Sequence, residues 1–155
     1  RVPRLIRKAS DLGIATCCFF VAGTPGETKE DRRETRGFIR ELARQCVQEV
    51  VMPIMTPFPA TPSMAEESLQ GFPEIDQLCF SPVWRKDYAP LNRFRISVYF
   101  HYYLTRLIFH PIGFVGMLAR VLSGRCRTKG EMTARRLVFD LFDKIRSLGE
   151  PEVCS

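Results

Sequence analysis

The sequence lacks the patterns that build most metal sites. Its 155 residues include six cysteines but no Cys-x-x-Cys, and its two histidines do not stand at zinc spacing, so no metal site is predicted within this chain. Cys17 and Cys18 are adjacent on an expected strand, where their side chains would leave opposite faces and could not bind one ion together. We expect both to be small buried side chains in a reducing compartment, and we predict a cytoplasmic location.

Long apolar runs are also missing. Charged residues interrupt every early apolar stretch, so no signal peptide is predicted. Residues 92–122 are densely aromatic and apolar, but His101, Arg106 and His110 interrupt them and Pro111 divides them. Because no uninterrupted span of about 20 apolar residues exists, we predict two packed helices rather than a transmembrane segment.

The net charge of +6 lies entirely in residues 91–155, because positive and negative side chains balance over residues 1–90. Such a segment can meet nucleic acid, anionic lipid or an acidic partner, although a solvated basic face is the more frequent explanation. Nucleic-acid binding needs exposed aromatic side chains among the basic residues. The aromatic residues of 92–122 follow the pattern of a helix core instead, so no nucleic-acid binding is predicted. Peripheral contact with a membrane surface remains an alternative.

A strand followed by a tight turn is the most informative local pattern. The apolar run from Gly13 to Ala22 predicts a strand buried on both faces, as in a parallel sheet covered by helices. Pro25 and Gly26 then predict a turn in which the glycine takes a positive φ. Thr28 and the acidic residue three positions later, Asp31, predict a capping box at the start of a helix.

The following residues extend this pattern into a β-α-β unit. Apolar residues recur at helical spacing over 30–46, and the valine-rich segment 47–52 predicts a second strand. Four prolines between residues 53 and 62 then exclude regular structure. Because the carboxyl ends of parallel strands meet at one edge, the 23–28 turn and the proline-rich loop should open on the same rim.

The remaining segments give weaker signals. Residues 63–69 predict a short helical piece, and the cluster at 84–88 could stack on a ligand or pack against the sheet edge. Apolar residues at helical spacing over 134–148 predict a final helix that ends at Gly149.

Two linked motifs resemble the late part of a radical S-adenosylmethionine domain. They are the strand that runs into Gly23-Thr24-Pro25-Gly26-Glu27-Thr28 and the segment from Val50 to Pro53 with the loop Thr56–Pro62. The chain looks most like the subgroup with an N-terminal cobalamin-binding domain, which includes the oxidative cyclases of magnesium-protoporphyrin monomethyl ester. Thr24 departs from the bulky aliphatic residue usual in that subgroup, and Ala60 departs from the usual glycine.

The resemblance implies an α/β fold in which this chain supplies the last β-α-β portion of a partial (β/α)₆ TIM-like barrel and a C-terminal helical extension. It divides the chain into barrel (1–65), connector (66–90) and extension (91–155). It also implies a [4Fe–4S] cluster and S-adenosylmethionine, which together generate a 5′-deoxyadenosyl radical that abstracts hydrogen from a small-molecule substrate; whether cobalamin is used stays open. By the motif match, Gly23, Pro25, Gly26 and Glu27 would line the S-adenosylmethionine side, and the adenine or substrate side would be lined by Pro57, Phe58 and Thr61.

The Cys-x-x-x-Cys-x-x-Cys motif that holds such a cluster does not occur in the sequence. We therefore expect the chain to be a C-terminal fragment whose cluster is bound by an N-terminal segment of the same polypeptide, and to be inert when isolated, with no catalytic residue of its own. The alternative hypothesis is a non-catalytic binding module, whose basic aromatic tail docks on a membrane surface or a partner protein.

Overall fold

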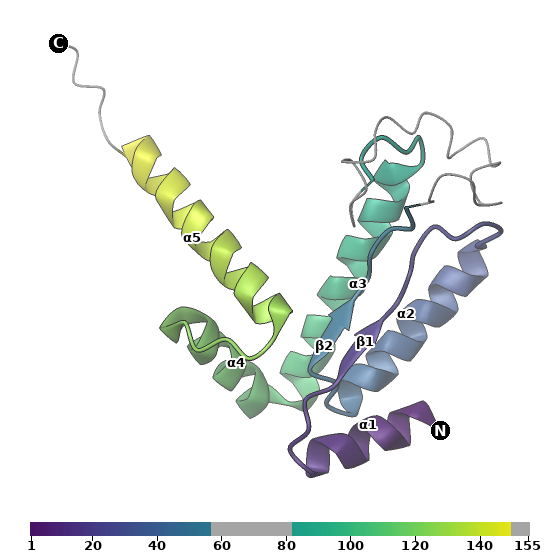
Figure 1. Ribbon diagram of the computed structural model, residues 1–155, viewed down its shortest axis with the longest axis horizontal. Helices are drawn as coiled ribbons and strands as arrows, with labels where there is room; N and C mark the ends of the chain where they lie inside the picture. Colours follow the sequence, from purple (N-terminus) through teal and green to yellow (C-terminus); the bar gives the residue numbers. More distant parts are fainter. Residues whose placement is uncertain (57–81, 150–155) are drawn as a thin grey trace. The chain divides into compact units, whose positions relative to one another are not determined.

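Helices make up most of the chain in the computed structural model, which describes residues 1–56 and 82–149. The first compact unit, Arg1–His110, holds α1 (Val2–Asp11), β1 (Cys17–Phe19), α2 (Lys29–Arg44), β2 (Glu49–Val51) and α3 (Tyr88–Phe109) (Figure 1). The second unit, Pro111–Ser155, holds α4 (Pro111–Ser123) and α5 (Lys129–Gly149). The helical piece predicted for 63–69 lies outside the described residues.

The predicted β-α-β unit is confirmed. β1 and β2 pair in parallel with Cys18 opposite Val50, and an isolated bridge between Ala22 and Ile54 continues the pairing. β1 is shorter than the predicted run because α1 ends in a Schellman motif that uses the first residues of that run. Gly13 takes a φ of 72° there, and the N–H of Ile14 donates to the Ala9 carbonyl.

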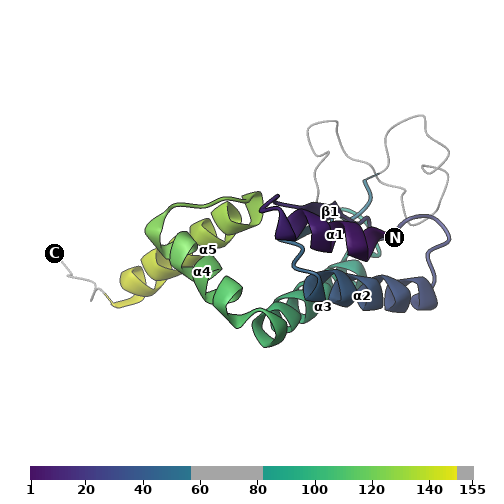
Figure 2. The same ribbon diagram turned by 90° about the horizontal axis from the view of Figure 1, so that it is seen from below.

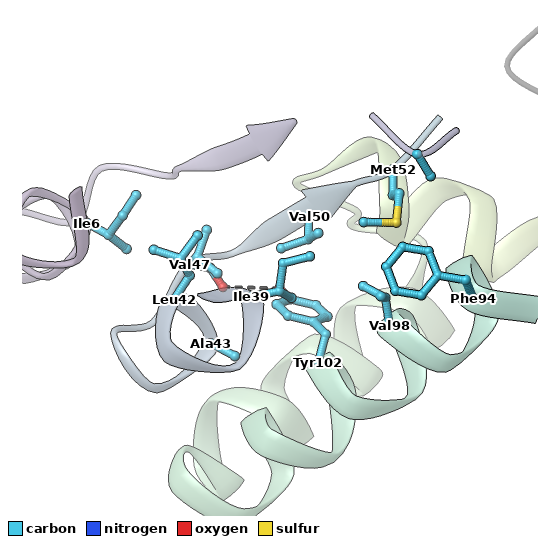
Figure 3. Close-up of a cluster of buried hydrophobic side chains, with 11 residues drawn as sticks. Ile6, Ile39, Leu42, Ala43, Val47, Val50, Met52, Phe94, Val98 and Tyr102 are labelled. Carbon is cyan, nitrogen blue, oxygen red and sulfur yellow. Dashed lines mark hydrogen bonds between the residues drawn. The ribbon is translucent and has the colours of Figure 1, made fainter. Parts of the chain in front are cut away.

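Both long helices of the first unit cover the same face of the strand pair. Figure 2 shows α2 and α3 side by side on one side of β1, and the two helices pack against each other. Figure 3 shows the core that they form with β2. Its buried members from the two helices and β2 are Ile39, Leu42, Ala43, Val50, Phe94, Val98 and Tyr102.

The prediction of a strand buried on both faces is wrong for the described residues. Side chains alternate across a strand, so Cys18 and Phe20 pack on the core while the intervening residues point the other way. Phe19 is 68% exposed, Val21 is 50% exposed, and Cys17, expected to be buried, is exposed. The apolar pattern of this segment predicts that both faces of the strand are covered. In the described residues, the face that carries Cys17, Phe19 and Val21 stays exposed.

The capping box at the start of α2 is confirmed. The Thr28 hydroxyl accepts from the Asp31 N–H at 3.2 Å, and the Asp31 carboxylate accepts from the Thr28 N–H at 2.8 Å. The hydrogen bonds from the Thr28 backbone and hydroxyl lower the pKa of Asp31. This cap fixes where the turn ends and the helix begins.

The predicted division of the aromatic segment at Pro111 is also confirmed, since α3 ends at Phe109 and α4 begins at Pro111. In the described residues no single helix is long and apolar enough to span a membrane; α3 and α4 meet those limits of length and composition only as a bent pair. Arg106 is buried, and its guanidinium donates to the Gln48 carbonyl at 3.0 Å and to the Tyr102 hydroxyl at 3.2 Å. Burial raises the pKa of Tyr102 although Arg106 acts in the opposite direction.

A buried carboxylate organises the turn between α4 and α5. Glu131 accepts from the Arg120 guanidinium at 2.6 Å and from the Arg127 N–H at 2.6 Å, and it is only 5% exposed. Burial by itself would raise the pKa of Glu131, but the hydrogen bonds from Arg120 and Arg127 outweigh it and lower the pKa. The ionised carboxylate is thus the form that holds this turn.

We predict that the second unit loses stability in acid through Glu131. Because the pKa in the folded state is lowered, the contribution is complete above the ordinary glutamate pKa and is lost as the pH falls through the lowered one. Glu131→Gln should cost about 1–2 kcal/mol at neutral pH and reduce the acid dependence, measured by far-UV circular dichroism during urea unfolding. Asp140→Asn, at an exposed site on α5, is the control, and equal behaviour of the two variants contradicts this role.

Candidate functional site

A tight turn follows β1 at the carboxyl end of the strand pair. The Glu27 N–H donates to the Thr24 carbonyl at 3.0 Å, and Gly26 takes a φ of 76°. With proline and glycine in the two central positions, this is a type II turn. The turn predicted at Pro25 and Gly26, with the glycine at a positive φ, is confirmed. Both residues are exposed.

Glu27 ties this turn to α2. Its Oε2 atom accepts from the Gly23 N–H at 2.9 Å and from Arg32 Nε at 2.9 Å, and its side chain is 9% exposed. A buried carboxylate with a cationic partner and a backbone donor is well satisfied. The contacts made by Glu27 are therefore those of a residue that holds the turn in shape.

Gly23 lies against the side chain of Leu91 on α3. Its φ is 78°, and a Cβ atom built on it would lie 2.6 Å from Leu91 Cδ1. Both the conformation and the space thus disfavour a larger residue. A Cβ at Gly26, by contrast, would meet no atom within 4 Å, so the backbone there faces open space.

Arg85 joins the loops that follow the two strands. Its Nη1 donates to the Met55 carbonyl at 2.7 Å and to the Gly23 carbonyl at 3.2 Å, while Nε and Nη2 bind the two carboxylate oxygens of Asp87 at 2.8 and 2.7 Å. The residue is 4% exposed. The Met55 N–H also donates to the Ala22 carbonyl at 2.8 Å. We call the described part of these two loops, residues 20–27 and 52–56, the carboxyl rim.

The structure brings together Gly23, Pro25, Gly26 and Glu27, the residues predicted to line the S-adenosylmethionine side. They fall into two pairs with different surroundings. Gly23 and Glu27 are engaged within the protein, whereas Pro25 and Gly26 present an exposed surface at the carboxyl rim. Pro57, Phe58 and Thr61 lie outside the described residues. Sequence reasoning missed Arg85 as the joining residue, although Asp87 two positions later was a signal for a bidentate ion pair.

No metal centre emerges from the described parts of the chain, where no three potential ligands among histidine, cysteine, aspartate and glutamate gather. No protein family, curated protein or solved structure matches this sequence.

Proposed function

We propose that this chain is the C-terminal part of a radical S-adenosylmethionine enzyme and that the carboxyl rim forms part of the surface that holds S-adenosylmethionine. The observation that carries the proposal is the joining of the Gly23–Glu27 turn to the loop after β2 by Arg85. In parallel α/β folds, ligands bind at the carboxyl ends of the strands. The two loops whose motifs resemble that family follow the carboxyl ends of neighbouring parallel strands.

The exposed apolar side chains on the second face of the strand pair support the same proposal. In a (β/α) barrel, helices cover the outer face of each strand, and side chains from the other strands fill the interior. Here α2 and α3 cover one face, while Phe19 and Val21 stand exposed on the other. A strand pair taken from a barrel wall would have this distribution of apolar side chains.

The carboxyl rim and Arg85 would hold such a ligand through two groups of residues. Pro25 and Gly26 would contact S-adenosylmethionine through exposed backbone, since the space beside Gly26 is open. Gly23, Glu27 and Arg85 would keep that backbone in position. The cluster and S-adenosylmethionine, when bound, supply a radical that removes hydrogen from a small-molecule substrate; the cluster ligands would come from another segment of a longer polypeptide.

The test is anaerobic isolation of the native polypeptide that contains this chain, followed by reconstitution with iron and sulfide. With S-adenosylmethionine and a reductant, 5′-deoxyadenosine should form, whereas residues 1–155 alone should form none. Gly26→Ala should raise the KM for S-adenosylmethionine about tenfold, equivalent to about 1.4 kcal/mol. Gly13→Ala is the matched control, because Gly13 also has a positive φ and open space but precedes β1. Absence of 5′-deoxyadenosine from the native polypeptide overturns the proposal.

A second candidate function, docking on an anionic membrane surface, is favoured by one observation on α3. Five large side chains form an exposed apolar stripe along one face of this helix, and Arg93 is exposed one turn before it. Arg106, farther along the same helix, is buried and does not take part. The stripe consists of Ile96, Phe100, Tyr103, Leu104 and Leu107.

Sedimentation with anionic vesicles tests this candidate. Binding should weaken with salt, and Phe100→Asp should abolish it, because a charge in the stripe opposes insertion. Phe139→Asp, at an exposed phenylalanine of α5, is the matched control. If both variants bind as the unmodified chain does, the stripe has no role in membrane docking.

A further inference from the structure

Cys46 stands at a backbone position that usually belongs to glycine. After α2 the N–H of Cys46 donates to the Ala43 carbonyl and the N–H of Val47 to the Leu42 carbonyl, which is a Schellman motif. Cys46 takes a φ of 65°, whereas the equivalent position after α1 is Gly13, with a φ of 72°. A side chain in this conformation costs about 1 kcal/mol, so the motif itself gives no reason for a cysteine.

The Cys46 thiol contacts an imidazole from the far end of α3. Sγ lies 3.2 Å from both ring nitrogens of His110, which is 64 residues away along the chain. His110 Nε2 lies 2.9 Å from the Arg44 carbonyl oxygen. A carbonyl only accepts hydrogen bonds, so we assign an N–H to Nε2, and Nδ1 is then the ring nitrogen that can accept the thiol proton.

This arrangement has the parts of an activated nucleophile. A thiol, a base within reach and a third group that fixes the orientation of the base are the features that make cysteine reactive. Cys46 and His110 are both half-buried, so neither is enclosed in the core. The Arg44 guanidinium stacks on Phe109, 5.1 Å from the ring centroid, and places a positive charge on the residue next to His110. A small disulfide that carries carboxylates fits this setting.

We propose that Cys46 and His110 form a reactive thiol–imidazole pair that takes up a small anionic disulfide, such as oxidised glutathione, as a mixed disulfide on Cys46. His110 Nδ1 accepts the thiol proton, and the thiolate attacks one sulfur of the reagent. The reagent's S–S bond breaks, and the leaving thiolate takes the proton from His110. One disulfide is consumed and one is formed, and the second glutathione leaves as a thiol. This inference does not depend on the proposed radical chemistry.

Two other described cysteines provide internal comparisons. Cys17 is exposed, so accessibility alone would make it react before the half-buried Cys46. Burial raises the pKa of the Cys18 thiol, which opposes formation of its thiolate. The order of reaction therefore separates activation by His110 from simple exposure.

The experiment treats the full chain with oxidised glutathione at neutral pH, stops the reaction with acid and measures each cysteine by peptide mass mapping. Cys46 should react about tenfold faster than Cys17, because an unactivated thiol is only a few per cent thiolate at neutral pH. His110→Gln should lower the rate at Cys46 by about the same factor and leave Cys126, in the second unit, unchanged.

A second measurement keeps the test valid if His110→Gln does not fold. In concentrated urea, the unmodified chain should lose the preference, so that Cys46 and Cys17 react at similar rates. The proposal is overturned if Cys17 reacts as fast as Cys46 in the folded chain. It is also overturned if a folded His110→Gln variant keeps the full rate at Cys46.

Discussion

Gly23→Ala is expected to lower the free energy of unfolding of the first unit by about 3 kcal/mol. About 1 kcal/mol comes from placing a side chain at a φ of 78°. The rest comes from overpacking, because the new methyl group would lie 2.6 Å from Leu91 Cδ1, and Leu91 is only 1% exposed. The measurement is urea unfolding followed by fluorescence of Trp84, the single tryptophan of the chain and a member of the first unit.

Two further variants separate the clash from the backbone cost. Gly13→Ala has the same unfavourable φ without a neighbour within 4 Å, so it should lose only about 1 kcal/mol. In a double-mutant cycle, Leu91→Ala should recover part of the Gly23→Ala loss, because the shorter side chain relieves the contact. Equal losses for the two glycine variants, or strict additivity in the cycle, would show that α3 does not press on the turn.

Arg85→Ala is the second large expected effect, at about 3 kcal/mol. The substitution removes the donor shared by the Gly23 and Met55 carbonyls and leaves Asp87 without its cation. Arg85→Lys should lose less, about 1–2 kcal/mol, since lysine keeps the charge but cannot reproduce the planar fork. The same fluorescence measurement applies.

Arg33→Ala is the matched control for Arg85. It also removes an arginine from an ion pair, but that pair, with Glu30, is exposed at 79% and 62%. Exposed pairs contribute little, so the loss should be about 0.5 kcal/mol or less. If Arg85→Ala is no more destabilising than Arg33→Ala, then Arg85 does not hold the carboxyl rim together.

The features that sequence predicted well are local. The Pro25–Gly26 turn follows from the fixed φ of proline and the freedom of glycine, and the Thr28 capping box follows from a three-residue spacing. The parallel β-α-β unit required only two apolar strands with an amphipathic helix between them. The break at Pro111 follows from the missing N–H of proline.

The features that sequence missed depend on contacts between distant residues. Arg85 donates to the carbonyl of Gly23, 62 residues earlier in the chain. No sequence pattern around either residue predicts this contact. Cys46 contacts His110 only because α2 and α3 pack side by side. The end of α2 was also hard to predict, because a cysteine stands at the positive-φ position where glycine is the usual signal. The exposure of Phe19 likewise depends on what covers the strand pair, which the apolar pattern of the strand cannot specify.

The intact mass and N-terminal sequence of the native polypeptide would show whether this chain belongs to a radical enzyme, because the proposed function requires cluster ligands that residues 1–155 do not contain. We expect a longer polypeptide that carries Cys-x-x-x-Cys-x-x-Cys upstream of Arg1. A native polypeptide that begins at Arg1, or a longer one without that motif, would contradict the assignment to a radical enzyme and leave docking through α3 as the function to pursue.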